Sequence, residues 1–355
     1  MSCVHPGRGR GSPVGGVTRH RTEHQGIGAD VPRLIIGHSL DPLARRMPWL
    51  QRGVWRSEAW ILDVLLRTSR CLSVDRASAF GGALTARIGP RLAKHRHVLA
   101  NYRRAFPEWS AAEVERTARG MWYNLGRVLG EMAFVEQFCG RLEERIEIVD
   151  GGGLEVVRGG RRAAVLVGAH LGNWELAQTT PPRLGFEMTA LYSALNNPYL
   201  EAVIAATRSR LPCRFLEVEG APRQMLRELR DGRSIGLLMD QRDDDGELIP
   251  FFGIPAPTPT GPARLALRMG VPLVPVRVER LEGVRFRITL HPPVEPEPGC
   301  EGPREASVRM TAAINRLFEE WIRACPEQWL CVKRRWPRQR GKPPADQRRP
   351  AEAAA

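Results

Sequence analysis

The feature that most constrains the fold is a change of sequence pattern after residue 150. From there on, short apolar runs alternate with stretches of helical periodicity. Such alternation predicts an α/β fold in which a mostly parallel sheet is flanked by helices on both faces. The predicted strands cover residues 163–168, 188–192, 214–218, 234–239, 273–278 and 286–290, and the predicted helices cover 174–179, 199–210, 223–230, 262–269 and 305–324.

The part of the chain before residue 140 is predicted to be a helical N-terminal extension. Apolar residues recur at helical spacing from Trp55 to Val74, and a second helical stretch, Ala77 to Tyr102, is broken at Gly89-Pro90. A third stretch runs to about Phe138 and begins with Ser110-Ala111-Ala112-Glu113, the pattern of a capping box. We therefore divide the chain into a disordered basic segment (1–46), a helical membrane-proximal region (47–140), an α/β domain (141–337) and a disordered tail (338–355).

Charge and hydropathy narrow the range of partners. The formal net charge is +14, which attracts nucleic acid, anionic lipid or an acidic protein. Nucleic acid is the weakest of these, because the arginines are spread along the chain without a recognition motif.

No run of the sequence approaches the ~20 apolar residues of a membrane span. The 55–74 helix either lies on a membrane surface or packs on the domain, and the 1–46 segment either reflects the choice of start codon or is a basic membrane-attracted tail.

The cysteines give no sign of a metal site or of a disulfide framework. Their number is seven, and they form no CxxC pair and have no histidine at ligand spacing. We expect them to be reduced and structural, which suggests a chain that faces the cytosol and needs no metal.

One segment carries recognisable chemistry. The predicted 163–168 strand leads to His170, Gly172-Asn173 turns the chain, and Glu175 falls in the first turn of the next helix. An imidazole becomes a useful base when a carboxylate orients it and stabilises its cation. The H-x4-E spacing alone is a weak signal, because acidic residues favour helix N-termini in any case.

The context of this segment is more specific than the spacing. An H-x4-D/E box behind an apolar strand resembles the glycerolipid acyltransferases, and His170-Leu171-Gly172-Asn173-Trp174-Glu175 is similar to the branch of lipid A biosynthesis lauroyl/myristoyl acyltransferases. The resemblance covers about residues 70–337. Further segments that agree in order are Asn101–Pro107, Trp122–Arg127 with Glu131, Asn197-Pro198, Met239–Gln241, Pro250–Gly253, Thr258–Ala266 and Pro326–Trp329.

The resemblance implies an O-acyltransferase that needs no cofactor. The donor would be an acyl-carrier-protein or coenzyme A thioester, and the acceptor a hydroxyl of a lipid A precursor, or of a lysophospholipid, glycolipid or aminolipid. His170 would remove the hydroxyl proton, Glu175 would orient and charge the imidazole, and no acyl-enzyme would form. The protein would act peripherally on the cytoplasmic face of the inner membrane, attracted to its anionic surface. A non-catalytic anionic-lipid-binding protein is the alternative from another class, and retention of both His170 and Glu175 argues against it.

Several further residues are candidates for substrate binding. Asp240 and Gln241 end another predicted strand, so they belong either to the surroundings of the site or to an ordinary capped loop. Phe251-Phe252-Gly253 would form an acyl-chain wall or pack in the core, and the turn at Thr260-Gly261 would receive a phosphate or an oxyanion. Arg264 either binds phosphate or is a surface arginine. The candidate set is Asn173, Trp174, Asp240, Gln241, Phe251, Phe252, Gly253, Thr260, Gly261, Arg264 and Arg208.

Two departures from the lipid A enzymes put the acceptor lipid in doubt. Ser193 stands where those enzymes tend to have an arginine, so a phosphate or carrier contact would have moved, for instance to Arg208 or Arg210. Cys331 and Lys333 stand where an aromatic residue and a histidine are expected. Both differences leave the transfer chemistry unchanged.

Overall fold

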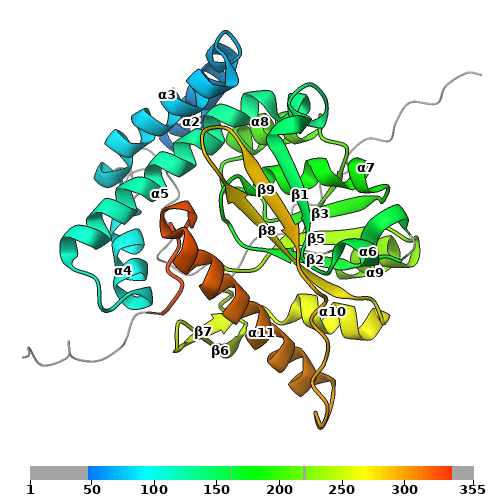
Figure 1. Cartoon of the computed structure of the whole chain (residues 1–355). Coiled ribbons are helices and arrows are strands. Elements are labelled where there is room, and N and C mark those ends of the chain that lie inside the picture. Colours follow the sequence, from blue (N-terminus) through cyan, green and yellow to red (C-terminus); the bar gives the residue numbers. More distant parts are fainter. Residues whose placement is uncertain (1–46, 161, 219–220, 338–355) are drawn as a thin grey trace, which may run out of the picture.

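A computed structural model describes residues 47–337 of the chain, apart from residues 161, 219 and 220. The sequence predictions for residues 1–46 and 338–355 therefore lie outside the described residues. The described part consists of a seven-stranded sheet, a two-stranded hairpin and surrounding helices (Figure 1).

The sheet is mostly parallel, as predicted. Its strand order is β1-β9-β8-β2-β5-β3-β4. All neighbours in the sheet run parallel except β8 and β9, which are antiparallel. The strands are β1 (Ile146–Asp150), β2 (Val165–Gly168), β3 (Met188–Tyr192), β4 (Arg214–Glu217), β5 (Ser234–Leu238), β8 (Leu273–Arg280) and β9 (Phe286–Leu290).

Helices cover both faces because the central strand is apolar on both sides. Val165 and Val167 of β2 join a core cluster with residues of α10 and α11, whereas Ala164 and Leu166 join another with residues of α6 and α7. Alternate side chains of a strand point to opposite faces, so both faces of β2 must be buried. The covering elements are α6 (Leu154–Val157), η6 (Trp174–Thr179), α7 (Thr180–Leu184), α8 (Pro198–Arg208), α9 (Pro222–Arg230), α10 (Gly261–Met269) and α11 (Pro303–Ala324).

The N-terminal extension is helical, as predicted, and lies on one side of the sheet (Figure 1). Ser110 and Glu113 form the expected capping box at the start of α5, and the helix interruption falls at Gly89, as expected. Helices α3 and α5 pack very closely through glycines, because a Cβ added to Gly126 would lie 2.1 Å from the carbonyl oxygen of Gly81. The extension comprises α2 (Pro48–Ser69), α3 (Val74–Ile88), η2 (Gly89–Arg91), α4 (His95–Ala105), α5 (Ala111–Glu131), η3 (Met132–Cys139) and η4 (Glu143–Arg145).

Some elements were not predicted from the sequence. Strand β1 at the sheet edge carries charged residues, and the short helices α6 and α7 lack a periodic pattern. Hairpin strands β6 (Glu247–Phe251) and β7 (Ile254–Thr258) contain several prolines, which argue against a strand in sequence analysis. The hairpin forms because Phe252 and Gly253 both take positive φ, 52° and 70°, as a tight primed turn requires.

No helix within residues 47–337 is both long enough and apolar enough to cross a membrane. Helix α2 packs on the domain through Ala59, Leu62 and Leu66, which are buried, and it contacts α8. The packing alternative therefore holds for this face of the 55–74 stretch. The opposite face remains exposed, with Trp60 65% and Ile61 47% accessible.

Candidate active site

Two neighbouring parallel strands, β2 and β5, deliver the central pair of the site. In the sheet register Gly168 at the end of β2 lies opposite Leu238 at the end of β5. The residues two positions further on, His170 and Asp240, therefore leave the same carboxyl edge side by side. This edge is where open α/β sheets usually bind their ligands.

His170 and Asp240 form a short hydrogen bond at this edge. The distance from His170 Nδ1 to Asp240 Oδ1 is 2.6 Å. A charged carboxylate only accepts hydrogen bonds, which assigns the ring proton to Nδ1 and leaves Nε2 as the basic nitrogen. The side chain of His170 is 19% exposed while that of Asp240 is fully buried. The pair thus has the geometry of a base held by a buried carboxylate.

Asp240 is held from behind by the C-terminal segment. Its Oδ2 accepts a hydrogen bond of 3.0 Å from Trp329 Nε1. Burial acts to raise the pKa of Asp240, but the charge of His170 and the hydrogen bonds from His170 and Trp329 outweigh burial and lower the pKa. The carboxylate therefore stays ionised, and it can stabilise an imidazolium as that cation forms.

Glu175 does not occupy the position that the sequence predicted. Its carboxylate accepts hydrogen bonds from Arg208, with Nη2 at 2.8 Å and Nε at 3.3 Å, and from Trp174 Nε1 at 3.2 Å. The expected contact between Glu175 and His170 is therefore corrected, because Asp240 holds the imidazole. The physical reason is that a buried carboxylate gains most from a bidentate guanidinium, which α8 brings to the first turn of η6.

Arg208 is fixed as well as charged. Its guanidinium lies over the rings of Tyr192 and Phe215, at 5.4 and 5.7 Å from their centroids. Burial acts to lower the pKa of Arg208, but the charge and hydrogen bonds of Glu175 prevail and raise it. The pair therefore holds a partly buried guanidinium on the Trp174 side of the site, over the ring of Tyr192, the residue before Ser193.

Two other candidates flank the imidazole directly. The amide nitrogen of Gln241 lies 3.3 Å from His170 Nε2, and the ring of Trp174 meets that of His170 edge to face, with 5.3 Å between centroids. Both side chains are partly exposed. Gln241 and Trp174 thus lie beside the imidazole at the same edge of the sheet.

A buried polar network holds the turn at Gly172-Asn173 in place. Asn173 Nδ2 donates to Glu131 Oε2 at 2.8 Å, and Arg280 binds both oxygens of Glu131 at 2.6 and 2.9 Å. Asn124 Nδ2 donates to the carbonyl oxygen of Gly172 at 2.9 Å. Asn173 is fully buried, so the structure places this predicted substrate-binding residue in the scaffold, away from the open surface.

Gly172 is required at this turn. Its φ is +58°, and an added Cβ would lie 2.9 Å from the carbonyl oxygen of Val278. A side chain here would clash with backbone as well as strain the turn.

The buried polar network also includes residues that the sequence analysis missed as site residues. Arg280 ends an ordinary strand and gives no signal, whereas Asn124, Gln328 and Trp329 all lie in segments that carried the family resemblance.

The aromatic candidates belong to the core. Phe251 and Phe252 are 0% and 8% exposed. Phe251 packs against Trp329 and Trp336, with ring centroids 6.0 and 5.8 Å apart. Gly253 is exposed at the hairpin turn. The core-packing alternative thus describes both phenylalanines, which support Trp329 and, through it, Asp240.

The remaining candidates lie where β7 leads into α10. Thr260 is buried, whereas Gly261 and Arg264 are exposed. The backbone N–H of Arg264 donates to the carbonyl oxygen of Thr260 at 3.0 Å. The start of α10 is therefore ordered, and Arg264 is free to meet an anion from solution.

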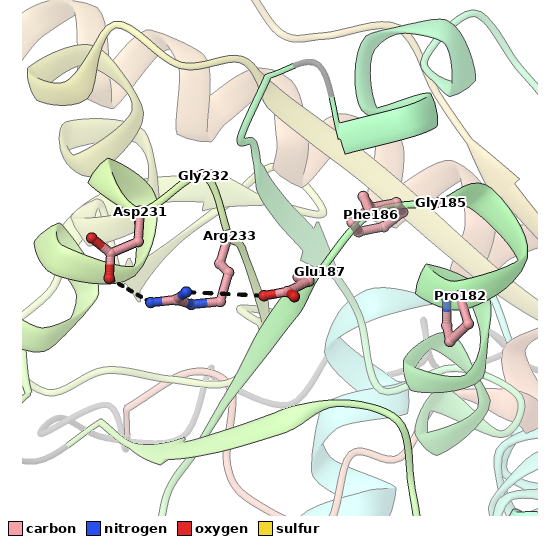
Figure 2. A pocket seen from close by; sticks show the side chains of 7 residues that line it. All are labelled: Pro182, Gly185, Phe186, Glu187, Asp231, Gly232 and Arg233. Carbon is pink, nitrogen blue, oxygen red and sulfur yellow. Dashed lines mark hydrogen bonds and ion pairs between the residues drawn. The ribbon is translucent and has the colours of Figure 1, made fainter. Parts of the chain in front are cut away.

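The cavity in Figure 2 lies at the other edge of the sheet. Its volume is about 450 Å³, and Glu187, Asp231 and Arg233 line it. Glu187 and Arg233 precede β3 and β5, so the cavity lies at the amino ends of these strands, opposite to His170. Arg233 is 2.6 Å from Asp231 and 3.9 Å from Glu187, which neutralises its charge.

In the part of the chain that the structure describes, no group of three or more His, Cys, Asp or Glu residues is arranged to hold a metal ion. Burial raises the pKa of Cys213 to about 12 and that of Cys325 to about 11. These thiols are therefore protonated and unsuited to nucleophilic attack.

Known acyltransferases share sequence with this chain. The sequence model of bacterial lipid A biosynthesis acyltransferases matches residues 51–338. A phosphatidylinositol mannoside acyltransferase of Mycolicibacterium smegmatis is 29% identical over 203 residues, covering 56% of this chain and 64% of that protein. One from Mycobacterium tuberculosis is 27% identical over 203 residues, covering 55% and 62%. The matched part of the chain thus spans less than two thirds of these relatives.

Among solved structures, the 1-acyl-sn-glycerophosphate acyltransferase of Thermotoga maritima is similar with a TM-score of 0.35. It shares 14% sequence identity, and the match covers 75% of this chain and 97% of that one.

Proposed function

This chain belongs to the bacterial lipid A biosynthesis acyltransferase family, and on that premise we propose that it transfers a fatty acyl group from a thioester to a hydroxyl group of a membrane lipid. The observation that supports this most is the contact between His170 Nδ1 and Asp240 Oδ1 at 2.6 Å. It leaves Nε2 available as a base at the carboxyl edge of the sheet.

The reaction then needs a single proton carrier. His170 Nε2 takes the proton of the acceptor hydroxyl as its oxygen attacks the thioester carbonyl, and Asp240 stabilises the imidazolium. The tetrahedral intermediate collapses by breaking the carbon–sulfur bond, and the imidazolium returns the proton to the leaving thiolate. Gln241, whose amide lies 3.3 Å from Nε2, is suited to donate a hydrogen bond to an oxygen of the reacting groups.

We propose that no acyl-enzyme forms on a cysteine. Cys331 is buried beside the site, and burial raises the pKa of its thiol. Cys325 is also buried, with a pKa of about 11. A thiol that stays protonated is a poor nucleophile, which favours direct attack by the lipid hydroxyl.

For the acceptor we propose a glycolipid that carries a phosphate. Two curated relatives are named for a phosphatidylinositol mannoside, and Ser193 departs from the lipid A pattern. Arg208 lies over the ring of Tyr192, next to that departure, and a phosphate there would share its guanidinium with Glu175. A lipid A precursor, which the family description favours, is the second candidate. The donor is an acyl-carrier-protein or coenzyme A thioester, both of which are acidic partners for a chain of net charge +14.

The proposed place of action is the anionic cytoplasmic face of the inner membrane, where the protein binds peripherally. Phe80, Leu84 and Ile88 of α3 are 55%, 38% and 47% exposed. Their spacing puts them on one helix face, which Arg76 and Arg87 also share. An apolar stripe with basic neighbours fits a surface of anionic lipid.

Product analysis tests the proposed activity. The purified chain is incubated with acyl-CoA or acyl-carrier-protein thioester and with a phosphatidylinositol mannoside, a lipid A precursor or a lysophospholipid, and products are identified by mass spectrometry. We expect acylation of a sugar-bearing acceptor that disappears in H170A. Equal product with wild type and H170A would contradict the mechanism, and acylation of the lysophospholipid alone would overturn the acceptor proposal.

Vesicle flotation tests the membrane proposal. Binding should increase with the fraction of anionic lipid and decrease with salt, because screening acts beyond a Debye length of ~8 Å at physiological ionic strength. F80S/L84S should bind less, whereas L248S, which removes a more exposed leucine from β6 (68% exposed), should bind as wild type does. Binding that ignores lipid charge, or that falls equally in both variants, would contradict the proposal.

A further inference from the structure

Arg335 is a buried cation without a carboxylate partner. It is 2% exposed, and its two terminal nitrogens donate to the carbonyl oxygen of Pro257 at 2.7 Å and to the hydroxyl of Thr258 at 2.6 Å. Both acceptors are neutral. Among the residues that the structure describes, no carboxylate oxygen lies within salt-bridge distance of this guanidinium, and its Nε has no hydrogen-bond partner. A buried charge of this kind is unfavourable unless an opposite charge offsets it.

The same aromatic cluster that holds Arg335 also holds Asp240. The guanidinium carbon of Arg335 lies 4.6 Å from the ring centroid of Phe251. Phe251 packs on Trp329, with 6.0 Å between ring centroids, and Trp329 donates to Asp240 Oδ2. When His170 is neutral, Asp240 is a buried anion without a cation in hydrogen-bond contact. The structure therefore holds an anion and a cation on two sides of one apolar cluster.

We propose that Arg335 is the counter-charge of Asp240 and that, by acting on the His170–Asp240 pair, it helps to keep His170 neutral in the resting enzyme. The assignment rests on the proposed function only in treating His170 as the base, since the charge balance itself needs no substrate. Arg335 is thus a positioning and charge-balancing residue. Its hydrogen bonds to Pro257 and Thr258 also fix the strand end that leads to Thr260.

The electrostatic surroundings agree with this assignment. Burial lowers the pKa of Arg335 to about 10, and the charge of Asp240 opposes that decrease. Tyr102 and Cys331 also face the cluster, and burial raises the pKa of each, so both are neutral near pH 7. Asn101 of α4 and Thr258 of β7 are neutral, and Lys333 is exposed. Arg323 lies 4.5 Å from the ring centroid of Phe252, but it is half exposed and pairs with Glu319 at 3.3 Å. Among the described residues, Arg335 is therefore the buried cation of the cluster that can offset Asp240.

Modification of His170 by diethyl pyrocarbonate tests the proposal without requiring acyl transfer. The reagent attacks neutral imidazole, so the rate at His170, followed by mass spectrometry of its peptide across pH, reports the fraction that is neutral. In R335Q the loss of a nearby positive charge should move the midpoint to higher pH by roughly 0.5–1 unit. R335K retains the charge and should keep the wild-type midpoint. R183Q removes an arginine that also donates to backbone carbonyls, and it should shift nothing.

A wild-type midpoint in R335Q, or the same shift in R335K, would overturn the proposal. Such a result could occur with acyl transfer intact, whereas a shifted midpoint without any acyl transfer would count against the proposed function alone. Thermal unfolding of D240N, R335Q and D240N/R335Q provides a second test if R335Q is poorly folded. The double variant should lose less stability than the sum of the single variants, and strict additivity would refute the pairing.

Discussion

Two carboxylates, Glu131 and Asp240, hold residues on either side of Gly172, but they differ in what they leave open to a substrate. Glu131, below the turn, is fully buried and accepts hydrogen bonds from Arg280, Ser78 and Asn173. Asp240, at the sheet edge, holds an imidazole whose side chain is 19% exposed and whose second nitrogen faces no carboxylate. The first carboxylate is saturated by its partners, and the second leaves one reactive atom for a substrate. Loss of a partner of Glu131 should therefore destabilise the fold, whereas loss of His170 or Asp240 should slow the proposed reaction.

The largest expected effect is on the rate in H170A. This substitution removes the proposed base but little buried surface, so acyl transfer should fall by ~10²–10⁴-fold while the fold is retained. Thiol release from the donor measures the rate, and circular dichroism checks folding. A folded variant with a tenth or more of the wild-type rate would break the distinction between the two carboxylates.

The next effect is on stability in R280M, which leaves Glu131 buried without its cation. Breaking such a pair should lower the free energy of unfolding by about 3–5 kcal/mol, as urea unfolding would measure. The control is R287M, which removes an exposed pair with Glu147 and should change stability by about 0.5 kcal/mol or less. Similar losses of unfolding free energy in R280M and R287M would mean that burial does not make the Arg280–Glu131 pair more important than the exposed Arg287–Glu147 pair.

D240N should act on the rate more than on the fold. It keeps the size of the side chain but removes the charge that orients and stabilises the imidazolium, so we expect a loss of ~10²-fold in acyl transfer, the lower end of what general-base catalysis contributes. The same urea experiment should show less destabilisation than in R280M. A variant that unfolds like R280M while transferring acyl groups at the wild-type rate would reverse the roles given to the two carboxylates.

The E175Q variant distinguishes the Glu175–Arg208 contact of the structure from the Glu175–His170 contact that the sequence predicted. Because Glu175 contacts Arg208, its neutralisation should weaken one ion pair and reduce the rate by less than about 10-fold, with the effect mainly on KM for a phosphate-bearing lipid. Kinetics with E175Q and D240N side by side make the comparison. A loss in E175Q as large as in D240N, with KM unchanged, would restore Glu175 as the partner of His170.

The smallest effect is the dependence of stability on pH. The folded-state pKa of Asp240 is lowered, so its contribution is present above the unfolded-state value of ~3.9 and is lost as pH falls below that value through the folded-state pKa. Between about pH 5 and pH 3, wild type should therefore lose more stability than D240N. Thermal unfolding across this range measures the difference, and parallel curves would contradict it.

Much of the fold followed from local patterns. The apolar strand ending at Gly168, the helix break at Gly89 and the capping box at Ser110 are each written in neighbouring residues, and each lies where the sequence predicted it. The β6–β7 hairpin was missed because its prolines disfavour strands, and an isolated hairpin can tolerate them. The family resemblance likewise rested on contiguous motifs, and His170 was found through them.

The partner of His170 was decided by tertiary structure alone. The sequence places Glu175 five positions away and Asp240 seventy positions away, and local spacing favours the nearer carboxylate. The parallel register of β2 with β5, which sets Gly168 opposite Leu238, brings Asp240 to the imidazole, while α8 brings Arg208 to Glu175. Likewise, nothing local indicates that Arg280 meets Glu131 or that Arg335 is buried. The sequence by itself determined which residues are candidates for chemistry. Strand register and helix packing decided which charges meet, because contacts between distant residues depend on how separate elements are assembled.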